Sequence, residues 1–107
     1  FLIYGASRGL GKAIVNLVPE AQDKVYGVSR SIPKNNAQLN WICADLSTPE
    51  DAVEKVKVAV KDEKIDVLIY NVGIWENNAF TENYNFKEVS SAELNTILNT
   101  NINTCRI

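Results

Sequence analysis

The sequence contains no histidine and no methionine, and its 107 residues include only two cysteines, Cys43 and Cys105. Without histidine, a zinc site would have to rely on carboxylates, because the two cysteines lack the CxxC spacing of zinc ligands. We therefore predict no metal site. Packing accounts for both cysteines instead: we expect Cys43 to be a small buried side chain in a strand and Cys105 to pack on a helix.

Strong charge and long apolar runs are absent too. The formal net charge is only -2, which gives no electrostatic reason to expect a nucleic-acid partner. The longest apolar runs span a few residues, far fewer than the roughly 20 of a membrane-spanning helix, and no charged-then-apolar leader opens the chain. We therefore expect a cytoplasmic protein of ordinary globular composition that binds neither nucleic acid nor membrane.

The length suffices for one hydrophobic core but is short for an enzyme that must hold both a cofactor and a substrate. The chain begins at Phe1 inside an apolar run and stops at Ile107 inside a helical pattern. We therefore expect residues 1–107 to form the N-terminal part of a single domain that continues beyond them.

Apolar runs and helical periodicities alternate along the chain. Apolar runs predict strands over residues 1–4, 24–28, 39–44 and 66–70. Helical spacing predicts three helices: from Gly9 until Pro19 ends it, from the Thr48 hydroxyl cap to about residue 60, and from the SSAE capping box at Ser90 onward. Residues 29–38 are expected to form a loop, and residues 74–89 a long loop with anchored turns.

Strands that alternate with helices imply right-handed crossovers and a parallel sheet with helices on both faces. This is a doubly wound α/β fold, the Rossmann fold, and four strands with three helices make slightly more than one of its mononucleotide-binding halves. Ligands of such sheets bind at the carboxyl ends of the strands. The glycine-rich segment 5–11, Asp45 and the segment 71–73 all fall at such strand ends.

The segment GASRGLGK, residues 5–12, joins the first predicted strand to the first helix. Glycines permit a tight turn here and let a pyrophosphate approach the amides at the helix N-terminus. A triphosphate-binding P-loop is excluded at two positions, because Ala6 and Ala13 stand where that motif needs a glycine and a Ser or Thr. For the glycine cluster alone, a tight turn without a ligand is the alternative.

Four motifs, in sequence order, resemble those of the short-chain dehydrogenase/reductase family. Residues 5–11 are similar to the family's TGxxxGxG loop, Asp45-Leu46 to its acidic position after the third strand, residues 71–73 to its NNAG motif and Asn101 to its helical asparagine. The resemblance covers nearly the whole chain. It implies that residues 1–107 are the N-terminal part of a single NAD(P)-binding Rossmann domain.

The chain departs from the family pattern at three positions. Tyr4 replaces a threonine, Tyr70 replaces the first asparagine of NNAG, and Val72 replaces its alanine. We therefore expect the hydrogen bonds at this edge of the sheet to be rearranged and cofactor binding to survive.

The resemblance implies a role for each matched residue. The amides around Ser7, Arg8 and Leu10 would face the pyrophosphate of the cofactor. Asp45 would accept a hydrogen bond from the adenine amino group, with Leu46 against the ring, and residues 71–73 would line the ribose and nicotinamide side. For Asp45, the alternative is a carboxylate that caps the following helix.

The second strand ends Val28-Ser29-Arg30 and offers no carboxylate for the ribose hydroxyls that NAD-preferring sites bind. Arg30 and Arg8 would instead form a guanidinium pair around a 2'-phosphate, with Ser29 as a hydroxyl donor. Solvated arginines without a ligand are the alternative. We therefore predict NADP rather than NAD. The expected cofactor-binding residues are Gly5, Ser7, Arg8, Gly9, Leu10, Gly11, Ser29, Arg30, Asp45, Leu46, Asn71, Val72 and Gly73.

The acid-base centre of the family is a tyrosine with a lysine four positions later, assisted by a serine and the helical asparagine. No tyrosine of this chain has a lysine at that spacing. Of the four catalytic positions only Asn101 is matched, and Asn99 and Asn103 are alternative asparagines in the same run.

These observations favour an NADP-dependent oxidoreductase that transfers hydride between the nicotinamide and a carbonyl or alcohol substrate, with this chain as its cofactor-binding half. The alternative is a non-catalytic NAD(P)-binding or regulatory module. Arg30 and the glycine spacing argue against a methyltransferase-like fold, and the spacing also argues against an epimerase. The resemblance further implies a homodimer or homotetramer.

Overall fold

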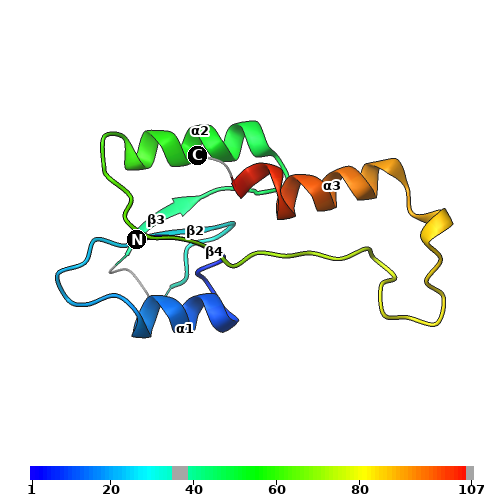
Figure 1. Ribbon diagram of the computed structural model, residues 1–107, viewed down its shortest axis with the longest axis horizontal. Helices are drawn as coiled ribbons and strands as arrows, with labels where there is room; N and C mark the ends of the chain where they lie inside the picture. The colour runs from blue at the N-terminus through cyan, green and yellow to red at the C-terminus, as the bar shows by residue number, and fades with distance from the viewer. Residues whose placement is uncertain (35–38, 106–107) are drawn as a thin grey trace.

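Four parallel strands form one sheet in the order β3-β2-β1-β4 in the computed structural model, which describes residues 1–34 and 39–105 (Figure 1). The strands are β1 Leu2–Tyr4, β2 Tyr26–Ser29, β3 Asn40–Cys43 and β4 Leu68–Tyr70. The helices are α1 Gly9–Leu17, α2 Pro49–Val60 and α3 Ser91–Asn101, with 3-10 turns η1 Phe86–Glu88 and η2 Asn103–Cys105. The predicted doubly wound arrangement is confirmed. Residues 35–38 of the predicted loop and residues 106–107 lie outside the described residues.

Helices cover both faces of the sheet, with α1 on one side and α2 and α3 on the other (Figure 1). Side chains of β1 alternate between these faces because successive residues of a strand point in opposite directions. Leu2 and Tyr4 join the core under α2, whereas Ile3 joins the core under α1, and all three are fully buried. This burial on both faces explains why the first strand is a continuous apolar run.

Backbone meets backbone where α1 begins. A Cβ atom on Gly11 would lie 1.9 Å from the carbonyl oxygen of Gly5, and one on Gly5 would lie 2.3 Å from the carbonyl oxygen of Asn71. No side chain fits in either place, so these two glycines permit the end of β1, the start of α1 and the end of β4 to touch.

The apolar face of α2 packs against the sheet. Ala52, Val56 and Val60 are buried against the sheet, while Val58 is exposed. The expectation that the Thr48 hydroxyl caps this helix is wrong. That hydroxyl instead donates to the main-chain oxygen of Asp45 at 2.9 Å. Across the part of the chain that the structure describes, no helix has both the length and the apolar character needed to cross a membrane.

Cys43 is less buried than expected. Cys43 is exposed, and its thiol lies 2.9 Å from the main-chain oxygen of Arg30. The expectation of a buried Cys43 is wrong because β3 is the outer strand of the sheet at this side, and only Ile42 of the strand is fully buried. Cys105 is half-buried and lies in the 3-10 turn η2.

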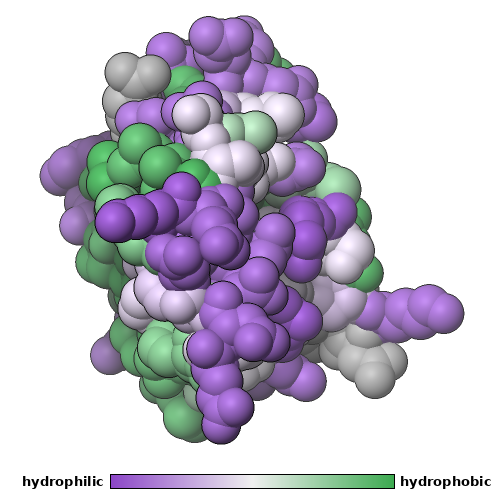
Figure 2. Space-filling view, turned by 90° about the vertical axis from the view of Figure 1, so that its right-hand side faces the viewer, coloured by the Kyte–Doolittle hydropathy of each residue, from purple (hydrophilic) through white to green (hydrophobic). Residues whose placement is uncertain are grey.

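Residues 74–89, which we call the arm, contain no α-helix or strand and run outward from the end of β4 before α3 leads back toward the sheet (Figure 1). Its turns are held locally: the rings of Trp75 and Phe80 pack edge to face at 5.2 Å, and the Tyr84 hydroxyl lies 3.0 Å from the Glu76 carboxylate. The predicted loop with anchored turns is confirmed. Viewed from the end that carries the arm, the centre of the molecular surface is mostly hydrophilic (Figure 2).

Replacement of Val56 by alanine tests the core under α2. Val56 is fully buried, so Val56→Ala removes apolar contacts and is expected to lower the free energy of unfolding of the full-length protein by about 2 kcal/mol. Val58→Ala, on the exposed side of the same helix, is the matched control and is expected to cost less than about 0.5 kcal/mol. Urea titrations of the two variants measure both values. Equal losses of unfolding free energy would contradict the assignment of Val56 to the buried face of α2 and of Val58 to the exposed face.

Candidate functional site

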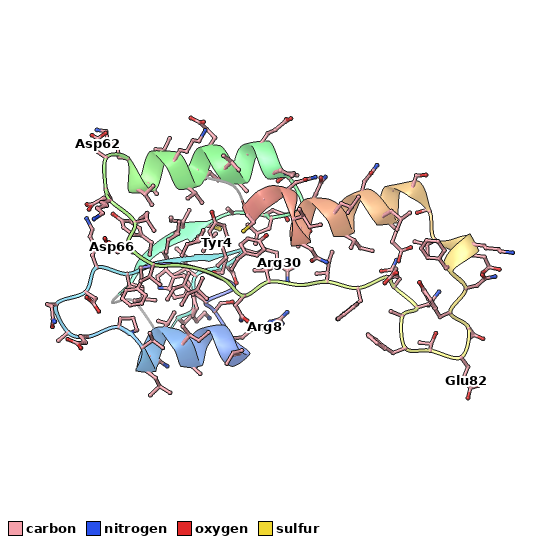
Figure 3. The ribbon with its side chains drawn as sticks, in the orientation of Figure 1. Tyr4, Arg8, Arg30, Asp62, Asp66 and Glu82 are labelled. Carbon is pink, nitrogen blue, oxygen red and sulfur yellow. The ribbon has the colours of Figure 1, made fainter. Side chains whose placement is uncertain are left out.

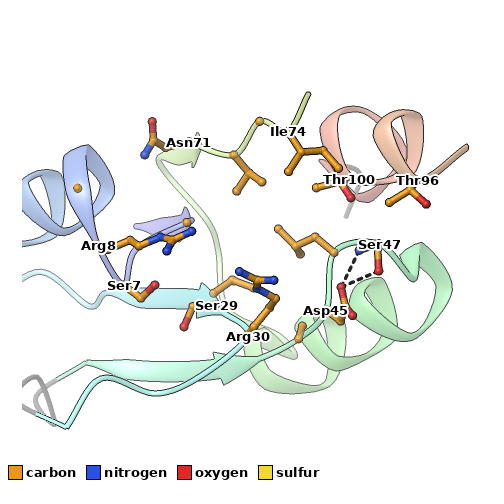
Figure 4. Close-up of a pocket in the computed structure, with 17 residues that line it drawn as sticks. Ser7, Arg8, Ser29, Arg30, Asp45, Ser47, Asn71, Ile74, Thr96 and Thr100 are labelled. Atoms are coloured by element: carbon orange, nitrogen blue, oxygen red, sulfur yellow. Dashed lines mark hydrogen bonds between the residues drawn. The ribbon is translucent and has the colours of Figure 1, made fainter. Parts of the chain in front are cut away.

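A cavity of about 570 Å³ opens at the carboxyl ends of the strands (Figure 4). The glycine-rich segment, the end of β2, the turn after β3, the segment after β4 and one face of α3 all contribute to its wall. Its lining residues are Gly5, Ser7, Arg8, Gly9, Val28, Ser29, Arg30, Ala44, Asp45, Leu46, Ser47, Asn71, Val72, Gly73, Ile74, Thr96 and Thr100. This is the position at which doubly wound sheets bind their ligands.

Most of the residues predicted from the sequence to bind a cofactor line this one cavity. Three predicted site residues do not line it. The Leu10 side chain is 66% exposed, and Gly11 is packed against the Gly5 carbonyl. Asn101, the predicted catalytic residue, turns its amide toward the main chain of Ile74. The structure therefore brings the other predicted residues together around one cavity.

The N-terminus of α1 lies at the cavity and has no side-chain cap. Arg8 is the N-cap residue, its side chain accepts no hydrogen bond, and the first turn contains no acidic residue. The first amides of a helix have no partner within the helix and carry partial positive charge. Gly9 has a φ of +56°, and a Cβ there would meet no atom within 4 Å. Open space in front of uncapped amides suits an anion, because phosphate oxygens can accept those hydrogen bonds.

Two arginines add positive charge to the same wall. Arg8 comes from the glycine-rich segment and Arg30 from the end of β2, and both side chains are exposed. They project into the space between the glycine-rich segment and β2 (Figures 3 and 4). Two guanidinium groups on one side of a cavity can bind a phosphate with paired, charge-assisted hydrogen bonds.

Ser29, the predicted hydroxyl donor, is buried and already has a partner. Its hydroxyl donates to the main-chain oxygen of Ser31 at 2.5 Å. A serine hydroxyl has a single proton, so donation to a ligand would require this bond to break. In the structure, Ser29 holds the turn that carries Arg30.

Asp45 closes a tight turn just after β3. Its carboxylate accepts hydrogen bonds from the Ser47 main-chain N–H at 3.0 Å and from the Ser47 hydroxyl at 2.7 Å. These two bonds hold the pKa of Asp45 below its usual range, and the bond from the Ser47 main chain has the larger effect. Such a carboxylate stays ionised and remains an acceptor at neutral pH. The expected alternative was a carboxylate that caps the following helix, but both donors belong to Ser47, which precedes the first residue of α2.

The segment that follows β4 is fastened to α3. The Ile74 N–H donates to the Asn101 side-chain oxygen at 2.8 Å, and the Asn101 side-chain nitrogen donates to the Ile74 carbonyl at 3.0 Å. The two bonds fix which end of the Asn101 amide carries oxygen and which carries nitrogen. They also hold the main chain of Ile74, which lines the cavity, against α3.

Six residues of the wall were missed by the sequence analysis: Val28, Ala44, Ser47, Ile74, Thr96 and Thr100. Four of them are direct neighbours of predicted residues along the chain, so a wider window around each motif would have found them. Thr96 and Thr100 carry a different signal, because positions four apart lie on one face of a helix. That face of α3 is the one that closes the cavity.

Comparisons with known proteins agree on one family. A model of the family described as short chain dehydrogenase matches residues 1–105. The 3-oxoacyl-(acyl-carrier-protein) reductase FabG of Vibrio cholerae is 34% identical over 72% of this chain and 35% of its own length. The hydroxysteroid dehydrogenase-like protein 1 of Gallus gallus is 29% identical over 94% of this chain and 33% of its length. The 3-ketodihydrosphingosine reductase of Bacteroides thetaiotaomicron is 28% identical over 98% of this chain and 39% of its own length.

Solved structures give the same result. A short chain dehydrogenase family protein from Francisella tularensis superposes with a TM-score of 0.74 and 25% identity over 94% of this chain and 39% of its own. The KRED1-Pglu enzyme superposes with a TM-score of 0.70, also at 25% identity, over 94% of this chain and 44% of its own. The chain thus spans between about a third and less than half of the length of the relatives it matches.

The turn at Asp45 can be tested by titration. Ser47→Ala removes the hydroxyl donor and keeps the main-chain donor, so we expect the pKa of Asp45 to rise toward its usual range without reaching it. Thr48→Ala is the matched control, because the Thr48 hydroxyl donates to the Asp45 main-chain oxygen and not to the carboxylate. Carboxyl carbon shifts followed by NMR against pH measure both.

The sign of the pH effect follows from the lowered pKa. The contribution of this turn to stability is present above the pKa of Asp45 in the unfolded chain, which is near 4, and is lost as the pH falls through the lower pKa of the folded state. Between these two pKa values, the free energy of unfolding of Ser47→Ala should therefore fall less with decreasing pH than that of the unsubstituted protein. An unchanged Asp45 pKa in Ser47→Ala would contradict the assigned cause.

Proposed function

Because the chain belongs to the short chain dehydrogenase family, we propose that it is the cofactor-binding part of an NADP-dependent oxidoreductase. The observation that carries the proposal is the uncapped N-terminus of α1, which opens on the same cavity as Arg8 and Arg30. The cofactor, when bound, supplies or accepts a hydride at its nicotinamide ring.

The pyrophosphate is assigned to the start of α1. Uncapped amides, the absence of acidic residues in the first turn and the open space before Gly9 all favour a doubly charged group there. The residues around this position, Ser7, Arg8 and Gly9, line the cavity. They would hold the pyrophosphate by main-chain hydrogen bonds that need no particular side chain.

The choice of NADP over NAD is assigned to two arginines. NAD-preferring sites place a carboxylate at the end of the second strand to bind the ribose hydroxyls, and here that strand ends with Ser29 followed by Arg30. Arg8 and Arg30 would bind a 2'-phosphate between them, and a carboxylate in the same place would repel it. Supporting this, the Ser29–Ser31 hydrogen bond holds the turn that carries Arg30.

The two ends of the cofactor are assigned to opposite sides of the cavity. Asp45 and Leu46 offer an ionised acceptor and a buried apolar side chain, which suit the amino group and the face of an adenine ring. The segment 71–73 lies on the other side, where it would line the ribose and the nicotinamide. The side chain of Asn101 would contribute there through the main chain of Ile74, which it holds.

The acid-base step is assigned to residues outside this sequence, because no tyrosine of the chain is followed four positions later by a lysine. The substrate class is proposed from the relatives, two of which are named as reductases of an oxoacyl and a keto compound. We therefore assign to the whole protein a carbonyl or alcohol substrate. We also propose a cytoplasmic location and a homo-oligomeric state, as expected from the sequence. A non-catalytic NAD(P)-binding module is the alternative, favoured by the missing tyrosine–lysine pair.

Removal of one arginine tests the cofactor preference. Arg30→Ala should weaken NADPH binding to the full-length protein about 10- to 100-fold, because charge-assisted hydrogen bonds to phosphate are lost. NADH binding should change by no more than about twofold. Lys12→Ala is the matched control, since it removes the same charge from an exposed residue of α1 that does not line the cavity. Fluorescence titrations with both dinucleotides measure the affinities; unchanged NADPH affinity in Arg30→Ala would refute the arginine assignment.

Turnover separates the enzyme from the binding module. The full-length protein is expected to oxidise NADPH in the presence of at least one member of a panel of aldehydes and ketones, followed by the loss of absorbance of the reduced nicotinamide. Arg30→Ala serves as the control, because it should raise the NADPH concentration needed for half-maximal rate. NADPH binding without turnover on any carbonyl or alcohol of the panel would favour the non-catalytic module.

A further inference from the structure

Two tyrosines stand side by side at the ends of the neighbouring strands β1 and β4. Tyr4 ends β1 and Tyr70 ends β4, and the two are direct partners in the parallel register. Their ring centroids are 4.9 Å apart with the planes tilted by 45°. Tilted aromatic pairs at this distance are attractive beyond the area they bury, so each ring restricts the position of the other.

The two hydroxyls differ in their surroundings. The Tyr4 hydroxyl is buried and has no hydrogen-bond partner among the described residues, so Tyr4 contributes its ring (Figure 3). The Tyr70 hydroxyl donates to the main-chain oxygen of Thr100 in the last turn of α3. Because α3 ends at Asn101, the Thr100 carbonyl has no partner within the helix, and Tyr70 supplies one.

Residues 70–74 are therefore fastened to α3 at both ends. The hydroxyl of Tyr70 binds Thr100 at one end, and the main chain of Ile74 binds the side chain of Asn101 at the other. The three residues between these two attachments, Asn71, Val72 and Gly73, line the cavity. A segment held at two points on one rigid helix has less freedom than a segment held at one.

We propose that Tyr70 is a positioning residue, which acts through Thr100 and Asn101 to hold the 71–73 segment in the orientation that the nicotinamide side of the cofactor requires. The part of this inference that concerns the cofactor rests on the proposed function. Burial raises the pKa of Tyr70 to about 12, so its hydroxyl keeps its proton and remains a donor through neutral pH. The Tyr4 ring supports Tyr70 from the neighbouring strand.

Tyr70→Phe tests the role because it keeps the ring and removes only the hydroxyl. The first readout is hydrogen exchange of the Ile74 amide in the cofactor-free, full-length protein, since that amide donates to Asn101. We expect its exchange to become about three- to tenfold faster. The Leu2 amide, which donates to Val67 within the sheet, is the reference and should change less than about twofold.

The second readout is the split between binding and turnover. We expect kcat with NADPH to fall about three- to tenfold while its KM changes less than about twofold, because the attachments of the phosphates lie elsewhere on the wall. Tyr26→Phe is the matched control: Tyr26 is a buried tyrosine of the same sheet, paired with Leu2 at the opposite end of the strands. In Tyr26→Phe, the exchange rate of the Ile74 amide and kcat should both stay within about twofold of their values in the unsubstituted protein.

Several outcomes would overturn the positioning role. Unchanged Ile74 exchange in Tyr70→Phe would do so, and so would equally accelerated exchange of Ile74 and Leu2, which would mean a general loss of stability. Should Tyr70→Phe fail to fold, the hydroxyl proton of Tyr70 in the unsubstituted protein decides: slow exchange with a through-space contact to Thr100 supports the role, and rapid exchange overturns it. Failure of the unsubstituted protein to bind either dinucleotide would refute the proposed function alone, because Ile74 exchange is measured without a cofactor.

Discussion

The close approach of three main-chain segments determines where the cavity lies. The carbonyls of Gly5 and Asn71 occupy the places that side chains on Gly11 and Gly5 would need. This contact brings the end of β1, the first turn of α1 and the end of β4 together. The uncapped helix end, the arginines and the segment after β4 can face one another only because those elements meet there. A larger residue at either glycine would push apart the parts of the wall before it changed any side chain that faces the cavity.

The neighbouring tyrosines show how the fold accepts unusual residues at the same strand ends. Tyr4 and Tyr70 stand where the family pattern has a threonine and an asparagine, and their rings pack together in the core under α2. The helix end gains a hydrogen bond to its Thr100 carbonyl, and the core keeps one buried hydroxyl that finds no partner among the described residues. Rearranged hydrogen bonds at this position, expected from the sequence, take this specific form.

Features set by neighbours in sequence could be predicted, and features set by distant contacts could not. The strands, helices, glycine-rich turn and Ser90 cap follow from local patterns, and the structure has them within a few residues of the expected bounds. Thr48 and Cys43 were misjudged because their surroundings are set by the turn at Asp45 and by the outer position of β3. The hydrogen bond between Ile74 and Asn101 joins residues 27 positions apart, and the one between Tyr70 and Thr100 joins residues 30 positions apart. No periodicity or motif in the sequence predicts such a contact.

The strand order has a consequence for how the chain acquires its structure. β1 lies between β2 and β4, and its register pairs Leu2 with Tyr26 on one side and with Leu68 on the other. A ribosome adds about 5–20 residues per second, so Leu68 emerges several seconds after Tyr26. During that interval one edge of β1 has no strand to pair with, and unpaired edges of apolar strands are prone to aggregation. One edge of the central strand β1 therefore stays without its partner strand until β4 has been made.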